Sequence, residues 1–174
     1  EDSATAQKNL AKWFLPCFGG IVFLLVWQFN SIRRAAIIIL TMPLVIVGSV
    51  VGLLVMQADF GFMVILGLLA LAGSIVNNGI VMIDKIEENR RDGQTPYDAV
   101  INSAVSRFRP ILLSVSTTML GFLPLIINHD PLFFGMASVM FFGLGIGSLF
   151  TLNYVPVLYS IFFRVKQTAE QVPG

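Results

Sequence analysis

The sequence predicts an all-α membrane protein with five transmembrane helices and a short amphipathic helix on the cytoplasmic membrane surface. Of its 174 residues, 56% are hydrophobic and only 12% are charged, whereas soluble domains carry about 25% charged residues. Five stretches contain no Asp, Glu, Lys or Arg, and they are 20, 24, 24, 20 and 33 residues long. Because roughly 20 helical residues cross the hydrocarbon core of a bilayer, each stretch can form a span. This composition excludes soluble enzymes, nucleic-acid binders and disordered chains.

The first three predicted spans follow one another with little polar sequence between them. Residues 1–12 form a polar lead-in on the extracytoplasmic side, and the spans cover residues 13–32, 35–58 and 60–83. The turn between the first two spans contains Arg33, whose side chain is long enough to reach lipid headgroups. We therefore expect an antiparallel series of hairpins with almost no soluble material.

A cytoplasmic loop, residues 84–109, is the one long polar connection. We expect the preceding helix to continue into this loop and to end at Gly93, since glycine readily adopts the left-handed conformation of a helix C-terminus. Thr95 is the expected N-cap of a new helix, with Pro96 at its first position and Asp98 in the capping-box place. Apolar residues then recur at three- and four-residue spacings, which is typical of a helix lying on the membrane surface. A helix that binds a partner protein is the alternative.

Two further spans complete the predicted bundle. Residues 110–129 form the fourth span, and residues 131–163 contain an interfacial segment, 131–136, followed by the fifth span. The last stretch exceeds the length of a simple crossing, so its first residues are assigned to the outer interface. Residues 164–174 form a cytoplasmic tail.

The positive charges fall mainly on one side of the predicted bundle. One side receives 2 of the 11 Lys and Arg residues, Lys8 and Lys12, and the other side receives the remaining 9. The positive-inside bias predicts a periplasmic N-terminus and a cytoplasmic C-terminus. Because residues 1–12 lack the apolar segment of a signal peptide, we expect further sequence, including at least one span, to precede this chain.

Intramembrane polar residues concentrate at one depth. No Asp, Glu, Lys or Arg lies within a span, and His129 lies in an outer loop, so this chain alone is not expected to shuttle protons. Asn77 and Asn78 are the most polar positions, and Ser114 lies at a matching depth on the next span. Adjacent amides point about 100° apart on a helix, so both cannot serve one partner helix. Interhelical hydrogen bonding and a polar relay completed by another part of the protein are both consistent with this pattern.

Other patterns favour packing over chemistry. Small residues at four-residue spacing, Gly48 with Gly52 and Gly143 with Gly147, indicate close helix approach. The seven methionines are scattered along the chain, so we predict no metal site and interpret them as gap-filling or lipid-facing residues. The sequence contains no nucleophile–base arrangement and no phosphate loop. We therefore expect no cofactor and no enzymatic activity.

Three motifs carry a resemblance to a known family. Residues 73–84 read Gly-Ser-Ile-Val-Asn-Asn-Gly-Ile-Val-Met-Ile-Asp, residues 107–114 read Arg-Phe-Arg-Pro-Ile-Leu-Leu-Ser, and residues 121–125 read Gly-Phe-Leu-Pro-Leu. With these motifs the chain resembles the resistance–nodulation–division (RND) multidrug efflux permeases over essentially its whole length. The resemblance implies a twelve-helix bundle made of two repeats, of which this chain looks like helices eight to twelve, about half.

The resemblance also implies roles for individual residues. In the family, acidic residues on the fourth helix bind protons and communicate with a lysine on the tenth helix and a hydroxyl on the eleventh. Asn77 stands at the position of that lysine, Ser114 at the position of the hydroxyl, and Asn78 matches the asparagine that usually follows the lysine. Arg107 matches an arginine at the cytoplasmic mouth. An ammonium can neutralise a carboxylate, whereas the Asn77 amide can only form hydrogen bonds with it.

The resemblance implies the C-terminal transmembrane part of an exporter of drugs or other amphiphilic compounds, driven by the proton-motive force in a bacterial inner membrane. Its implied partners are the N-terminal repeat and the periplasmic domains of the same permease, a homotrimer, a periplasmic adaptor, an outer-membrane channel and the lipid bilayer, with no nucleic acid. A non-transporting membrane scaffold and an RND-type lipid exporter are the alternatives.

Overall fold

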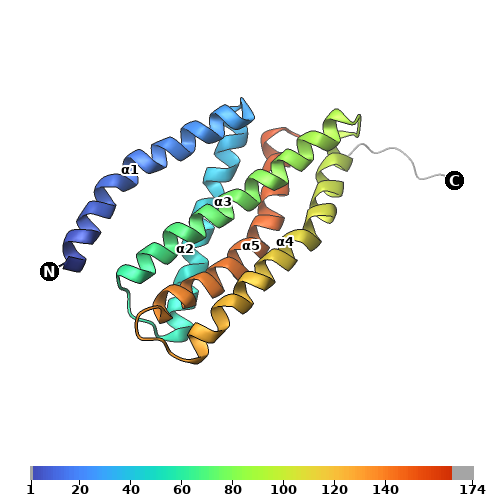
Figure 1. Cartoon of the computed structure of the whole chain (residues 1–174). Coiled ribbons are helices and arrows are strands. Elements are labelled where there is room, and N and C mark those ends of the chain that lie inside the picture. Colours follow the sequence, from blue (N-terminus) through green and yellow to red (C-terminus); the bar gives the residue numbers. More distant parts are fainter. Residues whose placement is uncertain (1, 166–174) are drawn as a thin grey trace.

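A computed structural model describes residues 2–165 of the chain, which form five α-helices joined by short turns. The helices run side by side in alternating directions (Figure 1). Their bounds are α1 (Asp2–Phe29), α2 (Ile32–Met56), α3 (Phe62–Arg91), α4 (Pro96–Ile127) and α5 (Phe134–Phe162). The all-helical prediction is confirmed, and the described part of the chain contains no strand.

Four of the helices, α2 to α5, are long and apolar enough to cross a membrane. In α1 the described residues give a shorter apolar segment, Leu15–Phe29, within the predicted first span 13–32. The predicted lead-in 1–12 is helical from Asp2 onward and continues without interruption into that apolar segment as part of α1. Of the predicted tail 164–174, residues beyond 165 lie outside the described part of the chain.

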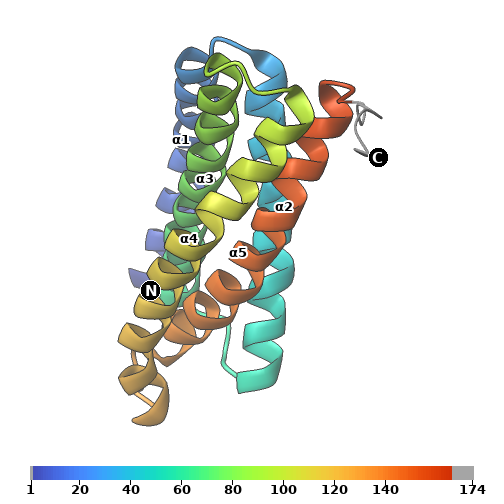
Figure 2. The same ribbon diagram turned by 90° about the vertical axis from the view of Figure 1, so that its right-hand side faces the viewer.

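The centre of the bundle is α5, which packs against α2, α3 and α4. Val139, Val155 and Tyr159 of α5 are fully buried. In contrast, α1 lies at the edge, where it packs mainly against α2 and only lightly against α3 (Figures 1 and 2). The part of the bundle that positions the polar residues of α3 and α4 is therefore built around α5.

Small residues bring α5 close to α2 and to α3. A Cβ atom added to Gly48 would lie 3.1 Å from the Cα atom of Gly143, and one added to Gly147 would lie 2.9 Å from Ile75 Cδ1 of α3. Glycine at these positions permits backbones to approach where larger side chains would keep them apart. The packing interpretation of these residues agrees with the structure.

The connection between α3 and α4 forms largely as its sequence predicts. Gly93 has a φ angle of +86°, in the left-handed region. Thr95 caps α4: its Oγ1 accepts a hydrogen bond from the Asp98 amide at 3.2 Å and donates one to Asp98 Oδ2 at 2.7 Å. The cap is local in sequence, which explains why it was predictable.

One predicted boundary is wrong. The surface helix and the fourth span, expected to separate at Pro110, form the single helix α4. A proline removes one backbone hydrogen bond, and strongly helical sequence on both sides tolerates that loss with at most a kink. Within the predicted interfacial segment 131–136, Pro131 to Phe133 form turns in which Asp130 Oδ1 accepts the amide hydrogens of Leu132 and Phe133, and α5 begins at Phe134.

Candidate functional site

The two adjacent amides of α3 face different surroundings. Asn78 is half-buried and donates a hydrogen bond from Nδ2 to the Ser148 hydroxyl of α5 at 3.2 Å. Asn77 is exposed on the outer surface of the bundle and has no hydrogen-bond partner within the described residues. The expectation that one partner helix cannot serve both amides agrees with this arrangement, which leaves Asn77 available to a group outside the chain.

Ser114 also lies on the outer surface of the bundle. Ser114 is exposed, and its backbone carbonyl accepts a hydrogen bond from Thr118 Oγ1 at 2.9 Å. No hydrogen bond joins Ser114 to Asn77 among the residues described, although α3 and α4 pack against each other. The two predicted relay residues therefore lie on neighbouring helices with both side chains turned outward, and the chain itself does not bridge them.

Charged residues gather at the end of the bundle formed by the α1–α2 turn, the α3–α4 connection and the end of α5, here called the basic end. Glu87 of α3 pairs with Arg34 of α2, with Arg34 Nη2 3.0 Å from Glu87 Oε2. The hydroxyl of Tyr159, buried in α5, donates to Glu87 Oε1 at 2.5 Å and accepts a hydrogen bond from Arg90 Nη1 at 3.0 Å. This network, the Glu87 cluster, links three helices.

Sequence reasoning did not find the Glu87 cluster, because Glu87 and Tyr159 are 72 residues apart. The only sequence signal is a tyrosine near the end of an otherwise apolar helix, where a buried hydroxyl needs a hydrogen-bond partner. Arg107, the predicted mouth residue, is half-buried near this end, and its buried Nε atom has no acceptor in the described part of the chain. Within the described residues, Arg107 forms no hydrogen bond with Asn77, Asn78 or Ser114.

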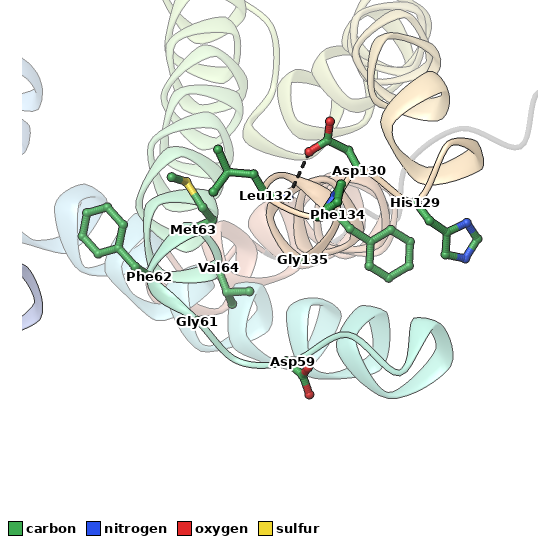
Figure 3. A pocket seen from close by; sticks show the side chains of 11 residues that line it. Asp59, Gly61, Phe62, Met63, Val64, His129, Asp130, Leu132, Phe134 and Gly135 are labelled. Atoms are coloured by element: carbon green, nitrogen blue, oxygen red, sulfur yellow. Dashed lines mark hydrogen bonds between the residues drawn. The ribbon is translucent and has the colours of Figure 1, made fainter. Parts of the chain in front are cut away.

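The opposite end of the bundle contains an open cavity of about 580 Å³ between the α2–α3 turn and the α4–α5 turn. Asp59, His129 and Asp130 are among its lining residues, but their side chains point in different directions (Figure 3). His129 stacks on Phe134 with ring centroids 4.8 Å apart. Among the described residues, no group of three or more His, Cys, Asp or Glu side chains could hold a metal ion.

Comparison with known proteins places the whole bundle in one family. The sequence profile of the AcrB/AcrD/AcrF family matches residues 1–163. The nickel-cobalt-cadmium resistance protein NccA of Alcaligenes xylosoxydans xylosoxydans is 30% identical over 176 residues, covering 97% of this chain and 16% of that protein. The nickel and cobalt resistance protein CnrA of Cupriavidus metallidurans is 32% identical over 171 residues, covering 94% of this chain and 15% of that protein.

Solved structures show the same architecture. Crystal form II of a heavy metal efflux pump matches with a TM-score of 0.83 and 26% identity, over 94% of this chain and 17% of the pump chain. Crystal form I matches with a TM-score of 0.77 and 28% identity, over 90% and 16%. The chain thus spans about a sixth of the length of the proteins it matches. The family profile, the relatives and the shared helical architecture confirm the resemblance: the chain is a multi-pass membrane segment that belongs to the AcrB/AcrD/AcrF family of RND permeases.

Proposed function

We propose that this chain is the C-terminal transmembrane part, helices eight to twelve, of an exporter that uses the proton-motive force to move a transition-metal cation such as nickel or cobalt. Two observations support metal cargo over the drug or amphiphile cargo that the family resemblance implies. The two relatives reported above are named for nickel and cobalt resistance, and the two solved structures reported above are described as heavy metal efflux pumps. Cargo recognition itself is assigned to parts of the permease outside this chain.

The observation that carries the transport role is the exposure of Asn77 within a stretch that contains no charged side chain. Asn77 lies in residues 60–83, which contain no charged side chain, and its amide faces outward without a partner in the described structure. An unpaired amide in hydrocarbon is unfavourable, so polar residues at such positions face a protein partner or a water-filled pathway. In our proposal the partner is a carboxylate of the N-terminal repeat.

The chemistry of an amide suits sensing more than charge neutralisation. The Asn77 amide can donate a hydrogen bond to an ionised carboxylate and can accept one from the protonated acid. Protonation of the carboxylate would therefore change the hydrogen-bonding pattern at Asn77, and Ser114 on α4 would respond in the same way. Movement of α3 and α4 relative to the N-terminal repeat would follow from these two changes.

The orientation and assembly of the permease follow the charge distribution and the resemblance. We propose that the basic end, with 9 of 11 Lys and Arg residues on its side, faces the cytoplasm and that the N-terminus of the chain is periplasmic in a bacterial inner membrane. The complete permease is proposed to contain an N-terminal repeat and periplasmic domains. It is proposed to assemble as a homotrimer with a periplasmic adaptor and an outer-membrane channel.

Tolerance assays in an efflux-deficient Gram-negative host test this proposal. The host expresses the whole permease as wild type, Asn77→Ala or Ser114→Ala, and growth is measured against nickel, cobalt and amphiphilic drugs. We expect the wild type to confer metal tolerance and both alanine variants to lose most of it at unchanged membrane abundance. The matched control is Asn153→Ala, since Asn153 is an exposed amide of α5 that bonds only within its own helix.

Each outcome bears on a separate part of the proposal. Drug tolerance without metal tolerance would show that the metal assignment is wrong while export is right. Wild-type tolerance in both alanine variants would show that the relay assignment is wrong. No tolerance of either kind, at normal abundance, would favour the scaffold alternative.

A further inference from the structure

One arginine joins the end of α1 to the rest of the bundle. Arg34, in the first turn of α2, donates a hydrogen bond from Nη1 to the backbone carbonyl of Phe29, the last residue of α1, at 3.2 Å. Its Nη2 atom lies 3.0 Å from Glu87 Oε2 of α3. Its Cζ atom lies 6.0 Å from the centre of the ring of Phe163, which directly follows α5. These contacts, here called the Arg34 clamp, reach α1, α3 and the end of α5 from a single side chain of α2.

The Arg34 clamp suits the chemistry of a helix C-terminus. The last carbonyls of an α-helix have no partner within the helix, and a cation near them interacts favourably with the helix dipole. A guanidinium can bond in two directions at once because its N–H groups are fixed in a planar fork. The Phe29 carbonyl and the Glu87 carboxylate take two branches of this fork, so the positions of α1 and α3 at the basic end depend on one side chain.

Away from the Arg34 clamp, little within the chain holds α1. Among its described side chains only Leu25 and Phe29 are buried, and both lie in the last two turns. Further from the basic end, an open space of about 620 Å³ lies between α1 and α3, with Leu24 and Ile80 among its lining residues. The helices α2, α3 and α4, in contrast, all pack against α5. Within this chain α1 is therefore fixed at one end.

The connection between α1 and α2 can accommodate a change of angle. It consists of Asn30, with a φ angle of +45° in the left-handed region, and Ser31, whose backbone is extended. A few residues between two helices can absorb a change of backbone angles while each helix stays intact. Because α1 has 28 residues and is about 42 Å long, a tilt of about 10° would move its far end by about 7 Å.

We propose that α1 is a lever whose tilt is set by the Arg34 clamp, while α2 to α5 behave as one body. With the clamp closed, one guanidinium holds both the Phe29 carbonyl and Glu87, and α1 keeps the orientation of Figure 1. When either contact breaks, α1 turns about the connection at Asn30, and its far end moves most. This lever involves only contacts within the chain, and it depends neither on the cargo nor on a relay role of Asn77.

Distances between spin labels in the whole permease test the lever. In a cysteine-free background, in which the exposed Cys17 is replaced by serine, labels are attached in pairs at Lys12 and Leu120, at Phe23 and Leu120, and at Leu54 and Leu120. All four labelled positions are exposed. Double electron–electron resonance then gives the distribution of each distance. The first two pairs report on α1 and the third on the body, and co-production with an excess of unlabelled permease restricts the signal to distances within one protomer.

Arg34→Gln should release α1. The distance distributions of both α1 pairs should broaden, about threefold more at Lys12, 17 residues from Phe29, than at Phe23, 6 residues from it, because displacement grows with distance from a pivot. The pair on the body should keep its distribution. The matched control is Arg33→Gln, which should change none of the three, because Arg33 is exposed and forms no hydrogen bond or ion pair among the described residues.

A second pair of variants opens the Arg34 clamp from the side of α3. Glu87→Gln removes the negative charge that holds the guanidinium and should broaden the two α1 distributions in the same order. Glu88→Gln is the matched control, since it loses only an exposed pair with Lys85 of the same helix and should broaden neither.

Three outcomes would overturn the proposal. Unchanged α1 distances in Arg34→Gln or in Glu87→Gln would show that the clamp does not set the tilt of α1. Equal broadening at Lys12 and at Phe23 would show that α1 slides or unfolds and does not pivot. Broadening of the body pair together with the α1 pairs would show that α2 to α5 do not behave as one body.

Discussion

Replacing Gly52 with alanine is expected to weaken the contact between α2 and α5. A Cβ atom at Gly52 would lie 2.9 Å from the Ser138 carbonyl oxygen and 2.9 Å from Phe142 Cβ, whereas ordinary contact begins at 3.4 Å. The two backbones must therefore separate by about 0.5 Å, which a closely packed interior resists. Overpacking of this kind lowers the free energy of unfolding by about 1–3 kcal/mol.

The matched control is Gly20→Ala in α1, where an added Cβ atom would meet nothing within 4 Å. Both substitutions gain about 0.5–1 kcal/mol from the higher helix propensity of alanine, so this contribution cancels when the two variants are compared. Reversible unfolding in mixed micelles, followed by far-ultraviolet circular dichroism, should show Gly52→Ala to be about 1–3 kcal/mol less stable than Gly20→Ala. Equal stability of the two variants would refute the close packing of α2 against α5.

Four substitutions test the polar contacts. Tyr159→Phe removes the hydroxyl that contacts two charged side chains and should lower the free energy of unfolding by about 1.5–3 kcal/mol; an unchanged value would show that the Glu87 cluster does not stabilise the fold. Asn89→Ala removes a buried amide of α3 whose Nδ2 donates a hydrogen bond to the Ser103 hydroxyl of α4 at 2.8 Å, so backbone hydrogen exchange should become faster where α3 meets α4. Unaltered exchange there would show that this bond does not hold the two helices together. Asn78→Ala loses the hydrogen bond to Ser148 and should lower the free energy of unfolding by about 0.6 kcal/mol, whereas Asn77→Ala should leave it unchanged. A larger loss of stability in Asn77→Ala than in Asn78→Ala would overturn the assigned orientations of the two amides.

Local sequence patterns predicted most of the fold. Long charge-free stretches set the membrane-crossing helices, because length and hydrophobicity act on each helix separately. The capping residues around Thr95 act within one turn, and their contacts formed as expected. Pro110 shows the limit of such rules, since a local helix breaker does not end α4 when the sequences on both sides are helical.

Contacts between distant segments could not be predicted in the same way. The bonds from Glu87 to Tyr159 and from Asn78 to Ser148 join residues 72 and 70 positions apart, and which helices meet depends on the packing of the whole bundle. The sequence indicated that one of the two adjacent amides had to face away from a given neighbour. Only the structure shows that Asn78 faces α5 and that Asn77 is the outward one.

Transport by the whole permease in proteoliposomes is the most direct test of the central proposal, in which Asn77 couples protonation to export. A pH gradient is imposed, and cobalt movement is measured with a fluorescent indicator for the wild type and for Asn77→Ala, with Asn153→Ala as the control. We predict that the gradient accelerates cobalt transport in the wild type and the control but not in Asn77→Ala. An undiminished response to the pH gradient in Asn77→Ala would contradict the proposal.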